Sequence, residues 1–218
     1  MTVRELAEFA ISLPYPPVCA LCGLDSPSPI CDSCRGEMVP ASMDLDAVPS
    51  DLDSILAVYA YESRARQAIR RLKYHRQTAL AAPMGAEIAQ LVRDNRLAPD
   101  VVVPVPIHWS RAAHRGFNQA TLLCRDLPFT VQPSLLRRVR RTRSQAGLSQ
   151  EDRRKNLDGA FRAQPCQGLS VLLVDDVFTS GETMRLCSQE LKRAGASVVM
   201  GVVYASGRPD MDFDYEDY

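Results

Sequence analysis

Two adjacent carboxylates and a hydroxyl-rich loop are the residues of this chain whose types and spacing best suit chemistry. Asp175 and Asp176 follow the apolar run Val171 to Val174 and precede Thr179-Ser180-Gly181. An apolar run without polar alternation is typical of a strand buried in a parallel sheet, and such sheets bind ligands beyond the carboxyl ends of their strands. Because neighbouring strand residues point to opposite faces, both acids can serve one ligand only if the strand ends at them.

The loop after the acids suits a phosphate. A helix is predicted from about Glu182 to Ala194, and its N-terminus would present unpaired N–H donors and a partial positive charge. Gly181 would remove the side chain where a phosphate approaches the backbone. The acids and the loop together predict a site for a phosphorylated sugar.

Other kinds of protein share parts of this pattern. Thr179 and Ser180 would merely cap the helix if this were an ordinary strand–turn–helix. Response-regulator receiver domains also begin with an apolar strand ending in paired aspartates, but too few residues follow Asp176 for the rest of that fold. The chain contains neither Gly-x-Gly-x-x-Gly nor Gly-x4-Gly-Lys-Ser/Thr, which argues against dinucleotide-binding and P-loop sites.

The run from Val171 to Thr183 resembles the ribose-phosphate binding motif of the type I phosphoribosyltransferases: four apolar residues, two acids, two apolar residues, then Thr-Ser-Gly-x-Thr. The resemblance implies that the acids hold the ribose 2′- and 3′-hydroxyls of phosphoribosyl pyrophosphate (PRPP) and that the loop holds its 5′-phosphate. The PRPP-binding residues expected from it are Asp175, Asp176, Val177, Phe178, Thr179, Ser180, Gly181, Glu182 and Thr183.

A second motif spans residues 102–119, where the apolar run Val-Val-Pro-Val-Pro leads into a predicted loop carrying Arg111, His114 and Arg115. The resemblance implies that this strand–loop–helix holds the pyrophosphate of PRPP. Phosphoribosyl transfer breaks the bond between ribose C1 and pyrophosphate through a cation-like sugar, so magnesium and fixed cations would stabilise the leaving group. The candidate catalytic residues are Asp175, Asp176, Arg111, Arg115 and Lys73.

Three further side chains lie in or beside this second motif. His108 and His114 are candidate proton shuttles, although pyrophosphate hydrogen bonding or plain exposure is the preferred interpretation. Trp109, the single tryptophan, is expected to pack, with stacking on a base as the alternative.

Four of the seven cysteines form the cluster Cys19-x2-Cys22-x8-Cys31-x2-Cys34. Two such pairs suit tetrahedral zinc, whose thiolates converge at about 2.3 Å from the metal. Two disulfides are disfavoured because no export signal is visible, and an iron–sulfur cluster is the remaining alternative. A closed four-thiolate site leaves no open position for chemistry, so its expected role is stability or partner contact. The other three cysteines are scattered, and Cys187 is expected to pack in the core.

Alternating strands and helices are predicted after residue 54, which indicates a mostly parallel sheet with helices on both faces. Strands are expected at 55–61, 100–105, 135–139 and 197–205, and helices at 64–73, 79–96 and 117–125. A short amphipathic helix is expected at 1–13.

Several segments together resemble the ComF family, amidophosphoribosyltransferase-like proteins that join a zinc-finger segment to a phosphoribosyltransferase domain. They are the cysteine cluster, Leu72-Lys73-Tyr74, the Val-Pro-Val-Pro and Arg-Gly-Phe-Asn-Gln runs, and residues 141–156. The resemblance implies a type I phosphoribosyltransferase fold preceded by a four-cysteine zinc-ribbon module. We expect a helix and zinc module at 1–50, the phosphoribosyltransferase domain at 51–208 and an acidic flexible tail at 209–218.

Net charge is zero, but its distribution is uneven. Six basic residues and no acids lie between Ser63 and Gly85, and eight more basic residues lie between 137 and 155. Within this second basic segment, residues 141–155 contain Gly147 and are a candidate mobile lid over PRPP. Because the chain has no apolar stretch of about 20 residues and no secretory signal, we expect a cytoplasmic protein without a membrane span.

The family resemblance implies a magnesium-dependent, PRPP-binding phosphoribosyltransferase linked to DNA uptake in natural transformation, and it leaves the acceptor open. The alternative is a catalytically silent PRPP sensor or a scaffold that binds single-stranded DNA and the uptake machinery. Charge reversal at Arg140, Arg141 and Arg143 would test that DNA surface. The basic runs lack interleaved aromatics, which weakens the expectation of a stacking surface.

Overall fold

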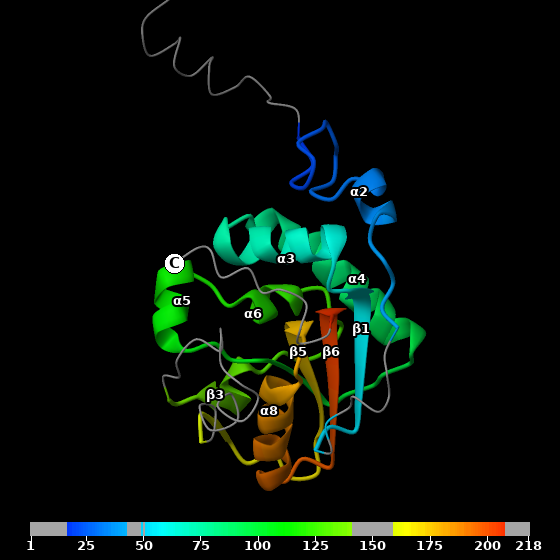
Figure 1. Cartoon of the computed structure of the whole chain (residues 1–218). Helices are drawn as coiled ribbons and strands as arrows, with labels where there is room; N and C mark the ends of the chain where they lie inside the picture. Colours follow the sequence, from blue (N-terminus) through cyan, green and yellow to red (C-terminus); the bar gives the residue numbers. More distant parts are fainter. Residues whose placement is uncertain (1–16, 43–48, 50, 141–158, 208–218) are drawn as a thin grey trace, which may run out of the picture.

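The computed structural model describes residues 17–42, 49, 51–140 and 159–207. The expected N-terminal helix, most of the basic segment and the acidic tail lie outside the described residues. Helices and strands alternate along most of the described chain (Figure 1). Their order is α2 (Asp32–Gly36), β1 (Ser54–Ala60), α3 (Ser63–Tyr74), η2 (Thr78–Leu80), α4 (Ala81–Asp94), β2 (Val101–Pro104), α5 (Trp109–Arg115), α6 (Gln119–Leu123), η3 (Pro133–Leu135), β3 (Leu136–Arg138), β4 (Phe161–Ala163), β5 (Ser170–Phe178), α8 (Glu182–Arg193) and β6 (Val198–Ser206).

A four-stranded sheet in the order β1-β6-β5-β2 forms the centre of the molecule, and every neighbouring pair in it is parallel. Residues 171–174 of β5 are fully buried, as expected for a strand covered on both faces. The predicted α/β architecture with a mostly parallel sheet is confirmed. Parallel strands place their carboxyl ends at one edge, so β2 and β5 deliver the two sequence motifs to the same edge.

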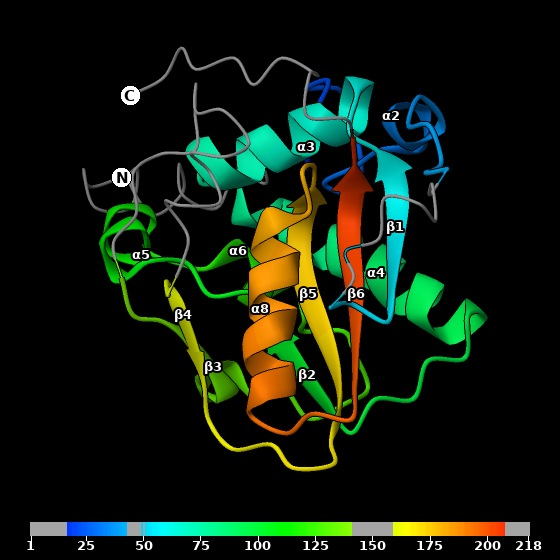
Figure 2. The same ribbon diagram turned by 60° about the horizontal axis from the view of Figure 1, so that its bottom comes forward.

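Helices cover both faces of the sheet, as predicted. Figure 2 shows α8 in front of the strands and α4 behind them. On the α4 side, α3, α4 and α6 share one core with Leu172 and Val174 of β5. On the α8 side, a second core joins Val171 and Leu173 to α8 and to the ribbon of β3 and β4. In Figure 1, α3 passes over the carboxyl ends of the strands.

Residues 17–42, which we call the four-cysteine module, lie against the outer side of α3 (Figure 1). The module contains α2, a helix that the sequence analysis did not predict. Its buried side chains belong to the same core as Ile69 and Leu72 of α3: Cys19, Leu21, Ile30, Cys34 and Met38. The Arg35 guanidinium adds an ion pair to Glu87 of α4, with 2.6 Å between Nε and Oε1. The module is therefore packed onto the main body of the protein.

One predicted strand differs from the structure in its context. The strand predicted at 135–139 is β3, but it lies outside the parallel sheet and pairs antiparallel with β4, which was not predicted. Strand β4 has only three residues, Phe161–Ala163, which are too few to show a strand period in the sequence. Cys187, expected in the core, is fully buried on α8.

Candidate functional site

The two sequence motifs meet at the carboxyl edge of the sheet. The N–H of Val105, the first residue after β2, donates to the carbonyl of Val174 across 2.8 Å. The Asn118 side chain donates to the Val105 carbonyl at 3.0 Å and accepts from the N–H of Ala120, so it also caps α6. The connection after β2 is thereby fixed beside Asp175, the next residue of β5.

The paired acids lie within β5 and not beyond its end. Pairing with β6 continues through Asp175 to Phe178, so the expectation that the strand ends at the acids is wrong. The apolar pattern stops at Val174, but backbone hydrogen bonding does not depend on side-chain polarity and continues. The acids consequently follow strand alternation, and Asp176 faces α3.

Lys73, predicted to contact pyrophosphate, instead reaches Asp176. Its ammonium nitrogen lies 2.8 Å from Oδ2 of that carboxylate, whose side chain is only 3% exposed. Burial disfavours the charge on Lys73, but the carboxylates of Asp176 and Asp175 outweigh burial and raise its pKa. The pair is therefore a charged, largely desolvated contact between α3 and the centre of the sheet.

Asp175 has the opposite electrostatic balance. Burial, followed by the neighbouring charge of Asp176, raises the pKa of the Asp175 carboxyl well above its usual value, and Lys73 compensates only in part. One oxygen of this carboxyl accepts the backbone N–H of Asp176 at 2.9 Å. The neutral form of Asp175 is thus favoured more than in an exposed aspartate, and the Asp176 side chain contacts the Lys73 ammonium.

The loop from Thr179 to Gly181 connects the acids to α8. Thr179 and Ser180 are partly exposed, and Gly181 is buried at the N-cap with φ +70°. A Cβ on Gly181 would lie 2.7 Å from the Phe178 ring, so the glycine accommodates that ring and a left-handed turn. The sequence analysis explained Gly181 by the space that a phosphate needs, whereas the structure adds a different reason, the close approach of the Phe178 ring.

We expect Gly181→Ala to destabilise the protein by about 2–4 kcal/mol, because it combines a left-handed conformation costing about 1–2 kcal/mol with a clash against Phe178. Gly168→Ala is the matched control, since Gly168 has φ +75° and a Cβ there would meet nothing within 4 Å. Urea unfolding of both variants separates the two costs. Equal destabilisation would show that the Phe178 contact contributes nothing.

Glu182 and Thr183, which were both expected to contact the 5′-phosphate, are the first two residues of α8. Both oxygens of the Glu182 carboxylate receive the Arg185 guanidinium, at 3.0 and 2.8 Å. The Glu182 carboxylate, which the motif places beside the phosphate, is therefore paired with Arg185. The backbone N–H groups at the start of α8 remain the donors best suited to an anion there.

The expected pyrophosphate loop is largely helical. Arg111, His114 and Arg115 lie on α5 and not in a loop, which corrects the sequence-based expectation. The Arg115 guanidinium stacks 5.2 Å from the ring centre of Tyr74, the residue after Lys73, and Arg76 donates to the His114 carbonyl at 2.6 Å. The end of α3 and α5 are therefore joined, which brings Arg115 to the side of the site where Lys73 lies.

Two aromatic residues at the start of α5 differ from expectation. Trp109, expected to pack, is 72% exposed, whereas His108, expected to be exposed or to bind pyrophosphate, is buried. Their rings lie 5.3 Å apart. Sequence patterns could not distinguish them, because burial here depends on how the connection after β2 turns into α5.

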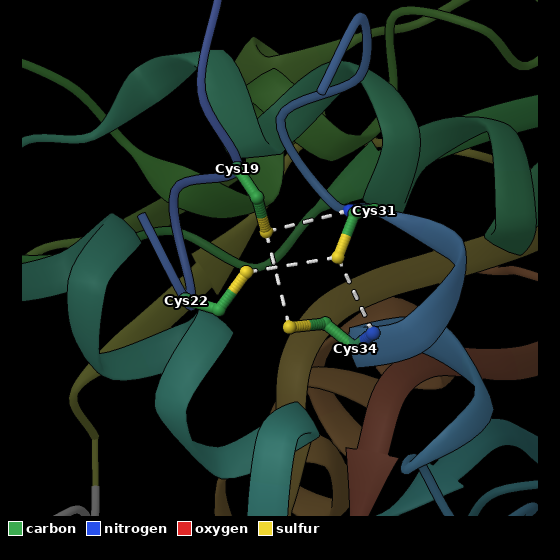
Figure 3. Close-up of side chains that lie close together, drawn as sticks. All are labelled: Cys19, Cys22, Cys31 and Cys34. Carbon is green, nitrogen blue, oxygen red and sulfur yellow. Dashed lines mark hydrogen bonds between the residues drawn. The ribbon is translucent and has the colours of Figure 1, made fainter. Parts of the chain in front are cut away.

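The four cysteines converge as the spacing predicts (Figure 3). All four sulfur atoms lie within 4.8 Å of one another, with 3.9 Å between Cys19 and Cys34 and 3.7 Å between Cys22 and Cys31. A tetrahedral ion with sulfur ligands at about 2.3 Å requires sulfur–sulfur distances of about 3.8 Å. All seven cysteines have free thiols. The cluster fits a tetrahedral metal and not two disulfides.

The local backbone prepares Cys19 to act as a thiolate. Burial opposes its ionisation, but N–H donors of the surrounding turns, including those of Leu21 and Cys31 at 3.4 Å, outweigh burial and lower its pKa from 9.0 to about 6. Burial and the neighbouring sulfurs raise the pKa of Cys34 to about 12. A second negative charge is thus disfavoured among four sulfurs unless a cation neutralises it.

Known proteins were compared with the chain as a whole. No family model matches it. The DNA utilization protein YhgH of Salmonella typhi is 33% identical over 84% of this chain and 81% of its own length. Competence protein F of Haemophilus influenzae is 31% identical over 67% of this chain and 70% of its own length. Competence protein ComFC of Bacillus subtilis is 25% identical over 82% of this chain and 72% of its own length.

Two solved structures are similar to this chain. The allosteric regulatory enzyme of purine biosynthesis is 21% identical, with a TM-score of 0.39 over 56% of this chain and 26% of that chain. A purine phosphoribosyltransferase from Pyrococcus horikoshii is 16% identical, with a TM-score of 0.32 over 63% of this chain and 93% of that chain. Among the described helices, none has the length and apolar character needed to cross a bilayer.

Proposed function

This chain belongs to the ComF family, and we propose that it binds PRPP with magnesium at the paired acids of β5. One observation carries the proposal. Within a single continuous segment, Asp175 and Asp176 lead through the hydroxyls of Thr179 and Ser180 into the N-terminus of α8, a helix of 12 residues. This segment supplies a carboxylate that can accept from sugar hydroxyls and, at the start of α8, donors for a phosphate.

The residues of the site divide into a ribose part and a phosphate part. Because the two acids point to opposite faces of β5, Asp176, held by Lys73, would accept a ribose hydroxyl, and Asp175 would support it through the hydrogen bond that it accepts from the Asp176 N–H. The 5′-phosphate would bind the N–H groups at the start of α8 and the hydroxyls of Thr179 and Ser180. Lys73 would thus act on the leaving group only indirectly, through Asp176.

The pyrophosphate would lie toward α5, where Arg115 is held against Tyr74. A guanidinium presents two parallel donors that match phosphate oxygens, which a lysine cannot reproduce. Arg111 lies on the same helix. Magnesium, bound with PRPP, would neutralise charge on the pyrophosphate as it leaves.

The four-cysteine cluster would hold structural zinc. Four thiolates around one ion satisfy its coordination, so no position remains for substrate. The sulfur–sulfur distances, the N–H donors to Cys19 and the free thiols of all four cysteines support zinc at this site. Its place against α3 favours a role in stability over one in chemistry.

Titration calorimetry with Mg·PRPP tests the proposed site. We expect wild type to bind and Asp175→Ala/Asp176→Ala to lose detectable binding, because the proposed ribose acceptor and the neighbouring carboxylate that supports it are both removed. Asp94→Ala is a control, since Asp94 is an exposed acid at the end of α4. Equal binding by wild type and the double variant would reject the acids as the ribose site.

Enzyme and sensor are separated by a second measurement on the same protein. Release of pyrophosphate from Mg·PRPP in the presence of bases or amines would establish transfer. Binding without release across such a panel would instead support a catalytically silent PRPP sensor. Either outcome is compatible with the proposed PRPP-binding site.

Binding of single-stranded DNA is the second candidate function, and the surface near α5 favours it. Tyr74 is 50% exposed and lies against the Arg115 guanidinium, and Trp109, at the start of the same helix as Arg115, is 72% exposed. Tyr74 lies within the first basic run, between Lys73 and Arg76, and the fold brings Arg115 of α5 against its ring. Relatives named for DNA utilization and competence support a role of this chain in DNA uptake.

We expect single-stranded DNA to bind with an affinity that falls as salt rises, and Trp109→Ala to weaken binding by about 1–3 kcal/mol through lost stacking. Leu24→Ala is the control, because Leu24 is 69% exposed on the four-cysteine module. Fluorescence anisotropy with labelled oligonucleotides measures both variants. If Trp109→Ala and Leu24→Ala bind alike, the α5 surface is not the DNA site.

A further inference from the structure

One helix, α3, lies between the cysteine cluster and the paired acids. Arg64, Gln67 and Arg71 recur at three- and four-residue spacing on one side of it. Lys73 lies two residues after Arg71, which turns it by about 200° around the helix axis. The helix therefore presents opposite sides to the two sites.

On the side toward the cysteines, α3 donates to the loop between Cys19 and Cys22. The Arg71 guanidinium donates to the carbonyl of Ala20, and the Gln67 amide donates to the carbonyl of Leu21 at 3.4 Å. Both carbonyls belong to residues between two predicted metal ligands. A bound metal would fix this loop, and with it the two acceptors that hold α3.

On the other side, α3 ends at the paired acids. The Lys73 ammonium is 2.8 Å from Asp176, and the Lys73 side chain is 19% exposed. Between the two contacts the helix is anchored by residues with no measurable exposure, Ala65, Ala68, Ile69 and Leu72. A packed helix moves as a body, because dense cores do not deform continuously.

We propose that Arg71 is a positioning residue that couples the cysteine cluster to the PRPP site through α3, so that zinc and Mg·PRPP bind cooperatively. The inference rests on the proposed function for its two ligands. Metal binding orders the loop from Cys19 to Cys22, Arg71 then fixes α3, and Lys73 holds Asp176 ready for the sugar. Coupling between two sites is reciprocal, so PRPP must tighten zinc by the factor by which zinc tightens PRPP.

The reciprocal effect gives a measurement that does not depend on catalysis. Zinc release from the full, zinc-loaded chain is followed with a chromogenic chelator in the presence and absence of Mg·PRPP. Coupling between sites is typically 5- to 150-fold, and we expect Mg·PRPP to slow release by about tenfold. PRPP in solution could also bind zinc directly. The Asp175→Ala/Asp176→Ala variant controls for this, because Mg·PRPP should not slow zinc release from a chain that lacks the proposed PRPP site.

Arg71→Met tests the proposed connection. Methionine keeps an unbranched aliphatic side chain at this position and removes the guanidinium that donates to the Ala20 carbonyl. We expect the variant to retain one zinc, to bind Mg·PRPP about tenfold more weakly, and to lose the slowing of zinc release. Arg93→Met on the exposed side of α4 is the matched control and should behave as wild type. Should Arg71→Met fold poorly, Gln67→Met replaces it, with a smaller effect in the same direction.

Hydrogen exchange provides a readout that needs no PRPP. Removing zinc should increase exchange in α3 and at 175–178 of β5, while α8 stays protected. The proposal is overturned if Mg·PRPP binds but leaves zinc release unchanged, or if Arg71→Met shows the wild-type slowing. If Mg·PRPP does not bind at all, the proposed function fails. In that case the coupling is still tested by hydrogen exchange, and unchanged exchange in α3 after zinc removal overturns it.

Discussion

Lys73→Met is expected to destabilise the folded protein by about 3–5 kcal/mol, because it leaves the carboxylate of Asp176 buried without its cation. The Asp176 side chain is 3% exposed, so water cannot replace the lost ammonium. For a protein of this size, about 3 kcal/mol corresponds to a fall in Tm of roughly 6–12 °C. Urea unfolding and thermal unfolding both measure the effect.

The origin of this cost can be isolated by removing the charge from both partners. We expect Lys73→Met/Asp176→Asn to recover at least about 2 kcal/mol relative to Lys73→Met, since no buried charge remains unpaired. Lys192→Met is the matched control. The Lys192 ammonium also lies close to a carboxylate, 2.7 Å from Asp53, but the Asp53 side chain is 44% exposed. This variant should cost no more than about 1 kcal/mol. Similar costs for Lys73→Met and Lys192→Met would show that burial does not set the strength of the pair.

Zinc removal is expected to have the second large effect. Structural zinc contributes about 10–16 kcal/mol of binding free energy in isolated peptides at neutral pH. Here the module also packs on α3, so part of its structure survives metal loss. We expect Cys34→Ser to lose the metal and about 5 kcal/mol of stability, which lowers Tm by roughly 10–20 °C. Metal analysis should find about one zinc per wild-type chain and none in the variant.

Cys124→Ser separates the metal from the loss of a buried thiol. Cys124 is as buried as Cys34, and its thiol donates to the Ala120 carbonyl at 3.1 Å, a bond that a hydroxyl can make. This variant should keep its zinc and lose no more than about 1–2 kcal/mol. Zinc affinity should also fall as pH falls, because the metal must displace protons from thiols such as Cys34, whose pKa is raised to about 12. A stable, zinc-free wild type would contradict the structural role.

Most of the secondary structure could be predicted from sequence, and the exceptions have physical causes. The strand and helix periods of β1, α3, α4 and β6 are long enough to be recognised, and their predicted limits lie within a few residues of those observed. The end of β5 was misplaced, because polar side chains do not interrupt a backbone ladder. The position of Arg115 on a helix was missed because a proline-rich start suggests a loop.

The sequence by itself determined the order of the longer strands and helices after residue 54, the four converging cysteines and the continuous segment from Asp175 to Thr183. Each of these depends on residues close together in the chain, where spacing and side-chain type limit the geometry. The tertiary structure alone decided that Lys73 binds Asp176, that Arg71 holds the loop carrying Ala20, and that Phe178 lies under Gly181. The first two join residues far apart in sequence, and the third depends on a ring orientation set by the core. Such contacts are fixed by packing, which no local pattern encodes.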